Sequence, residues 1–199
     1  MKGGVVIMNT KRILSLISVL LALTFFLPGK GWTQLFPYSG GGQPKPGTHG
    51  PIISHSFAVE KGYYGYIWKI YIDAEDPDGE MSRIASVVDQ VGVGRYPTDW
   101  IYLKSQYQKH FTGYIQWNTF STKTSYLPEW TQITLQVSVI DKAGNVSNEV
   151  VFPFTFEVTP QQYAYKLPAP FDQGNLPELG HIAVDLESPD HYGHDEKKY

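Results

Sequence analysis

Acidic side chains cluster directly after a strongly apolar stretch in the first half of the chain. Five carboxylates fall within eight residues, at Asp73, Glu75, Asp76, Asp78 and Glu80. Calcium takes about six to eight oxygen ligands, largely carboxylate and carbonyl oxygens, from a loop that can wrap around the ion. This loop is therefore a candidate calcium site, with calcium as the candidate cofactor.

Two further oxygen donors lie in the turn DKAGN at residues 141–145, namely Asp141 and Asn145. In a seven-stranded sandwich, the loop after the second strand and the loop between the last two strands lie at the same end. We therefore expect Asp141 and Asn145 near the acidic loop. The rival interpretation is a pair of solvated turns, in which Asp and Gly serve backbone geometry and Asp141 caps its own turn.

Aromatic residues make up 15% of the chain and supply a second candidate site. Exposed rings in a row can stack on sugars, and Trp100, Tyr102 and Trp117 are the candidate ligand-binding residues. The alternative is that these rings belong to the core or follow strand propensity, because aromatic side chains are favoured on pleated surfaces.

Catalytic motifs are missing from the sequence. There is no cysteine, which excludes disulfides, cysteine-ligated zinc and a thiol nucleophile. The sequence also has no G-x-S-x-G, H-E-x-x-H or glycine-rich phosphate loop. We predict a protein that is not an enzyme.

The stretch 131–156 predicts the element around which the fold is organised. Two runs alternate apolar and polar residues with period two, as half-buried antiparallel strands do. Their apolar faces are Ile133, Leu135, Val137, Val139 and Val150, Phe152, Phe154, Phe156. Because proline cannot donate a ladder hydrogen bond, Pro153 places the second strand near a sheet edge.

The segment VSVIDKAGNVSN, residues 137–148, resembles the last hairpin of bacterial immunoglobulin-like and fibronectin type III-like repeats, and the D-P-D-G-E run resembles calcium-binding loops of cadherin-like bacterial domains. The resemblance implies an antiparallel β-sandwich and a structural or adhesive role. The motif covers about the last quarter of the domain, and the remainder resembles the family in strand rhythm.

Other strands are predicted at 52–59, 63–74, 83–91, 99–103, 111–117 and 119–125, and a weak helix at 104–110. The fold class is therefore all-β: an immunoglobulin-like sandwich of seven to eight antiparallel strands over residues 51–157.

The flanking regions differ in composition from the predicted domain. Residues 1–34 combine Lys11 and Arg12 with a 15-residue apolar run at 13–27, which suits a signal peptide; an uncleaved membrane anchor is the alternative. Residues 35–50 are Gly/Pro-rich and predict a flexible linker. Residues 158–199 predict an extended or disordered tail.

Charge narrows the choice of partner. Residues 1–34 hold four of the 16 Lys and Arg residues, which leaves 12 against 19 acidic residues, a balance of −7. We expect no nucleic-acid partner, because phosphate contacts need Lys and Arg density, and no membrane contact after signal cleavage.

The predicted function is an exported, periplasmic or extracellular, non-enzymatic structural or interaction module of the bacterial envelope. Its partner is a protein or a glycan, and the alternatives are a carbohydrate-binding module and an enzyme accessory or inhibitor domain that docks by strand addition near Pro153.

Overall fold

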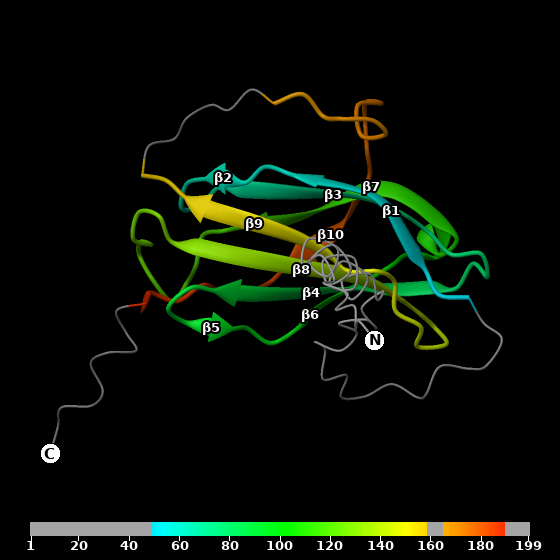
Figure 1. The fold of residues 1–199 in the computed structure, drawn as a ribbon, viewed down its shortest axis with the longest axis horizontal. Coiled ribbons are helices and arrows are strands. Elements are labelled where there is room, and N and C mark those ends of the chain that lie inside the picture. The colour runs from blue at the N-terminus through cyan, green and yellow to red at the C-terminus, as the bar shows by residue number, and fades with distance from the viewer. Residues whose placement is uncertain (1–48, 159–164, 190–199) are drawn as a thin grey trace, which may run out of the picture. The chain divides into compact units, whose positions relative to one another are not determined.

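Ten strands in two facing sheets make up the described part of the chain (Figure 1). The computed structural model describes residues 49–158 and 165–189, so the predicted signal peptide, nearly all of the linker and the last ten residues lie outside it. The first sheet has the order β1 (Ile52–Ala58), β3 (Ile67–Glu75), β7 (His110–Asn118) and β10 (Glu178–Ile182). The second has the order β2 (Lys61–Gly62), β9 (Val150–Phe156), β8 (Gln132–Asp141), β4 (Met81–Gln90) and β5 (Gly94–Arg95), and β6 (Asp99–Tyr102) also pairs with β4.

The core forms from the faces that alternation predicts. On β8 the odd-numbered residues from Ile133 to Val139 are all buried, and on β9 the three phenylalanines are buried as well. Strand β3 contributes Trp68, whose ring lies 4.5 Å from Phe154 of the other sheet and 6.2 Å from Trp117 of its own sheet (centroid distances). Full burial of a large apolar side chain contributes about 1.5–3 kcal/mol. Burial of these inward-facing side chains is therefore the main interaction that holds the two sheets together.

The all-β sandwich is confirmed, but the prediction that it is wholly antiparallel is wrong. Strand β2 runs parallel to β9, and β10 runs parallel to β7. Tight hairpins join only antiparallel neighbours, whereas a parallel pair needs a longer crossover. Both parallel pairs here join strands that are far apart in the chain, since several strands lie between β2 and β9, and β8 and β9 lie between β7 and β10.

Two local predictions also differ from the structure. Residues 119–125 form bends rather than a strand, because the Thr119 hydroxyl bonds the Tyr66 carbonyl at 3.0 Å and Ser121 is likewise buried and bonded. The weak helix at 104–110 shrinks to one 3₁₀ turn, η1 (Ser105–Tyr107).

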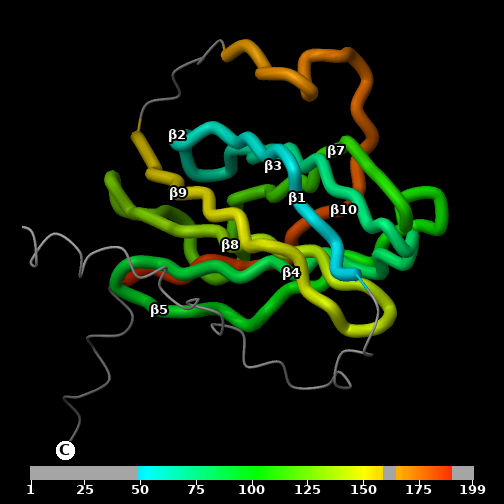
Figure 2. Tube along the Cα trace, turned by 45° about the vertical axis from the view of Figure 1, so that its right-hand side comes forward, coloured from blue at the N-terminus to red at the C-terminus, as the bar shows by residue number. Residues whose placement is uncertain are grey.

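The domain does not end at residue 157 as predicted. Phe171 is fully buried against Tyr71 on the outer face of the first sheet, with ring centroids 5.7 Å apart. The chain then forms β10 and continues along the open side of the sandwich toward β4 (Figure 2). Gly113 of β7 permits this approach, since a Cβ there would lie 2.8 Å from the Pro177 carbonyl oxygen. We call residues 178–189 the closing segment.

Candidate functional site

The acidic loop and the DKAGN turn do lie at the same end of the sandwich. The Lys142 amide donates to the Glu80 carbonyl at 3.0 Å, and Met81 pairs with Asp141 across β4 and β8. The two loops are therefore neighbours, as strand order predicts.

The two buried carboxylates at this end are already occupied by backbone amides. Asp76 accepts hydrogen bonds from the amides of Asp78 at 2.9 Å and Glu80 at 3.0 Å. Asp141 accepts the Asn145 amide at 2.8 Å and the Asn145 side-chain Nδ2 at 2.7 Å. Both side chains therefore stabilise their own turns, as the rival interpretation predicts.

The other predicted calcium ligands point to separate neighbours. Asp78 accepts the His49 amide at 2.6 Å, and this bond lowers the pKa of Asp78. Glu75 is exposed at the end of β3. In the part of the chain that the structure describes, no three His, Asp or Glu side chains are grouped to hold a metal ion. Calcium would thus have to displace existing hydrogen bonds, and it stays a prediction without a preassembled ligand set.

Asp73 lies apart from the loop, on the outer face of the first sheet. Its carboxylate accepts the Thr112 hydroxyl at 2.6 Å and contacts His55 Nδ1 at 3.0 Å and His110 Nε2 at 3.1 Å. Burial alone would raise the pKa of Asp73, but the Thr112 and His55 hydrogen bonds and the charge of His110 outweigh burial and lower it. Side chains from β1 and β7, the two neighbours of β3, thus favour the ionised carboxylate of Asp73.

The predicted aromatic row is only partly at the surface. Trp100 and Tyr102 share the outer face of β6 and are exposed, and the Arg83 guanidinium lies 4.7 Å from the Trp100 ring centroid. Trp117 is 0% exposed, and its Nε1 donates to the Val184 carbonyl at 3.0 Å. Trp117 cannot join a surface row, because the period-two alternation of β7 turns it into the core.

A groove that sequence reasoning missed lies at the other end of the sandwich, where β9 ends. Its volume is about 560 Å³. Three separate stretches line it: Tyr63 and Tyr64, residues 126–129, and residues 156–158. We call it the aromatic groove.

The walls of the aromatic groove are fixed by turns and by hydrogen bonds to the chain. The Tyr66 amide bonds the Tyr63 carbonyl at 2.9 Å, and the Tyr63 and Tyr66 rings meet edge-on at 5.5 Å. The Tyr64 hydroxyl bonds the carbonyls of Ser121 and Thr124. These contacts hold the tyrosine rings in place before any ligand arrives.

Trp130, beside the aromatic groove, has an unusual backbone. It has φ of 67°, the only positive value at a non-glycine residue in 49–158 and 165–189, and its side chain is 59% exposed. Its amide bonds the carbonyl of Phe156, a groove residue, at 2.8 Å. A large side chain in the left-handed region costs of order 1–3 kcal/mol, and such strain clusters at functional positions.

Two carboxylates complete the aromatic groove. Glu157 is paired with Lys61 Nζ at 2.9 Å, whereas Glu129 is exposed. The groove therefore offers ring faces and edges, tyrosine hydroxyls and one accessible carboxylate. This combination can stack on a ligand and bond its hydroxyl or amino groups.

Comparisons with protein-family models, curated proteins and solved structures found no match to this chain. Among the described residues, no helix has the length and apolar character needed to cross a membrane.

Proposed function

We propose that the described domain is an immunoglobulin-like sandwich that serves as an exported, non-enzymatic interaction module. Strand order supports the class. In the lettering of that fold, β1, β3 and β7 take the places of A, B and E, while β9, β8, β4 and β6 take those of G, F, C and C′. The pattern of residues 1–34 supports export to the periplasm or the cell exterior.

The aromatic groove is the binding surface in this proposal, and the observation that carries it is the exposed, strained Trp130 beside a preformed aromatic hollow. An exposed indole that needs a costly backbone conformation contributes little to folding, so a role in contacting a partner accounts for it better. Of the two carboxylates in the groove, Glu157 is paired with Lys61 Nζ at 2.9 Å, which leaves Glu129 as the exposed one for a ligand.

The first candidate ligand of the aromatic groove is a protein, and the second is a carbohydrate. The observation in its favour is that Tyr63, Tyr64 and Tyr126 line one groove together with Glu129. Aromatic rings pack on the apolar face of a sugar ring, while a carboxylate accepts hydrogen bonds from its hydroxyls.

The test places a photoreactive aromatic residue at position 126 in producing cells. Position 102 is the matched control, because Tyr102 is exposed on β6, away from the groove lining. We expect covalent adducts at 126 and not at 102, and their mass identifies protein or glycan. Equal adducts at both positions, or none at 126, would contradict the proposal.

A second variant, Trp130→Gly, separates binding from folding. Glycine adopts a φ of 67° without steric cost, so the melting temperature is expected to stay level or rise. Adduct formation at 126, and any signal on a glycan array, is expected to fall at least tenfold. Unchanged capture by Trp130→Gly would remove Trp130 from the site.

A further inference from the structure

The open side of the sandwich, between β7 and the β4–β5 edge, is a groove that the chain fills with its own closing segment. Inward and outward side chains alternate from residue 182 to residue 188, where Ile182, Val184, Leu186 and Ser188 are buried; Leu179 of β10 is buried as well. An extended peptide with a side chain inward at every second residue is what a strand-shaped binding groove selects.

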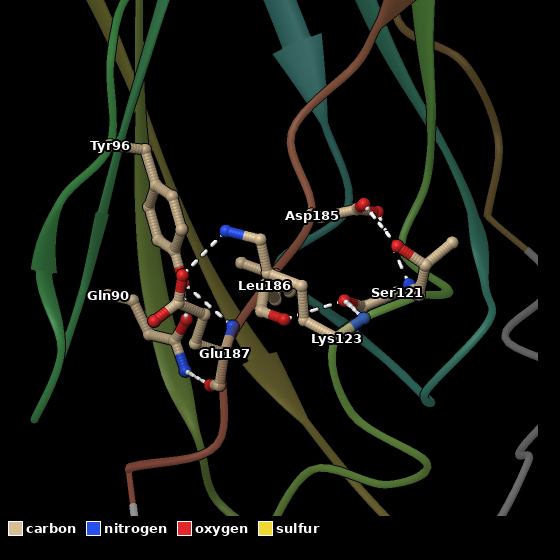
Figure 3. A network of polar contacts seen from close by, with 8 residues as sticks. Gln90, Tyr96, Ser121, Lys123, Asp185, Leu186 and Glu187 are labelled. Carbon is tan, nitrogen blue, oxygen red and sulfur yellow. Dashed lines mark hydrogen bonds and ion pairs between the residues drawn. The ribbon is translucent and has the colours of Figure 1, made fainter. Parts of the chain in front are cut away.

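The groove recognises the main chain of this peptide through side chains of the sandwich (Figure 3). Ser121 Oγ donates to the Leu186 carbonyl at 2.6 Å, and Gln90 Nε2 donates to the Glu187 carbonyl at 2.7 Å. The Tyr96 hydroxyl accepts the Glu187 amide at 2.8 Å and itself donates to Gln90 Oε1. Together with the Trp117 bond to Val184, these contacts form a row of donors and acceptors spaced for a strand.

Outward side chains of the closing segment are recognised as well. Asp185 accepts the Thr122 hydroxyl at 2.6 Å, and Glu187 pairs with Lys123 Nζ at 2.6 Å. Apolar side chains, main-chain groups and two acids therefore all have matching partners. This makes the fit specific to the sequence of the segment.

The connector before the closing segment is loosely attached. Residues 172–175 are exposed, between the buried Phe171 and the buried Leu179. Gly174 has φ of 81°, and a Cβ built there would meet nothing within 4 Å. The five residues 172–176 can span up to about 17 Å when extended, so the connector can adopt a different path up to Pro177, whose carbonyl accepts the Tyr114 amide at 3.0 Å.

We propose that the closing segment exchanges between two copies of this chain, each segment entering the groove of the other copy. The occupant is a second copy because every contact described above is reproduced when the same segment comes from an identical chain, and only the connector must change conformation. Within one chain, the connector holds the closing segment near its own groove at an effective concentration of order 1 mM. Exchange between two chains therefore competes with closure in one chain when the protein is highly concentrated or is refolding.

The absence of cysteine from the chain gives a direct test. Two single variants, Thr122→Cys and Asp185→Cys, are unfolded together, refolded at high concentration and oxidised. We expect a disulfide-linked heterodimer whose yield rises with protein concentration. The double variant in one chain serves as the reference for the bond, and Asp185→Cys mixed with Val151→Cys, an exposed position on β9, gives the random background.

A second measurement uses the connector. Deleting residues 173–175 shortens the reach of the connector by about 10 Å. We expect the closing segment of this variant to enter the groove of a second copy instead of its own, which gives a dimer by light scattering. Inserting six Gly/Ser residues at the same place is expected to keep the chain monomeric. Heterodimer yield at background level in the cysteine mixture, or a folded monomeric deletion variant at every concentration, would overturn the proposal.

Discussion

Replacing Leu186 with alanine tests whether the closing segment is part of the cooperative fold. Leu186 is 1% exposed and belongs to the apolar core between the sheets. The substitution removes three carbon groups, worth about 0.8 kcal/mol each in transfer free energy, or about 2.4 kcal/mol together. The cavity left behind adds to this loss, and buried Leu→Ala changes cost roughly 2.7–5 kcal/mol in total.

We therefore expect the free energy of unfolding to fall by about 3–4 kcal/mol. At roughly 4 °C per kcal/mol for a domain of this size, the melting temperature should drop by about 12–16 °C. Urea unfolding followed by tryptophan fluorescence measures the free energy, since the buried Trp117 bonds the closing segment directly.

The matched control is Glu187→Ala, next in sequence. It removes the ion pair with the half-exposed Lys123, and such pairs contribute about 0–1 kcal/mol. If Leu186→Ala cost no more than Glu187→Ala, the closing segment would not be an integral layer of the core, and the reasoning above would be refuted.

Two further predictions concern the charged groups. Because the pKa of Asp73 is lowered in the folded state, its carboxylate stabilises the fold above the ordinary Asp pKa of about 3.9, and this contribution disappears as pH falls through the lower folded value. Asp73→Asn should therefore be less stable than the parent in urea at pH 7, with the gap narrowing as pH falls below the ordinary Asp pKa; a gap that stays constant over that range would contradict the assignment. Millimolar calcium should leave the melting temperature unchanged, because Asp76 and Asp141 each already accept two N–H groups; a rise that Asp141→Asn abolishes would restore the calcium site.

Alternation carried most of the fold prediction. Strands β3, β8 and β9 each bury one face against a core, so the period of two is written directly in residues such as Leu135 and Phe152. The same signal was present for Trp117, since residues 111–117 also alternate, and applying it there would have placed the indole inside. The turn 141–145 was predictable in type, although Asp141 reaches Asn145, four residues on.

The remaining features depend on tertiary contacts that local sequence does not encode. Strand β10 has only Leu179 and Ile182 buried, and it lies among prolines and glycines that suggest a tail. The aromatic groove draws on three stretches separated by more than 25 residues each, so no spacing rule brings them together. Composition also does not distinguish a calcium site from two self-capped turns, because acidic residues in turns find backbone amides close at hand.

The position of the closing segment also sets an order of events. Every strand of the second sheet, and three of the four in the first, precede β10 in the chain. Before the closing segment is made, Trp117 Nε1, Gln90 Nε2 and the Ser121 hydroxyl lack the backbone carbonyls that they donate to in the folded domain, and one side of the core faces water. The domain can therefore become fully stable only after residue 189 has emerged, because the closing segment covers the last open side of its core.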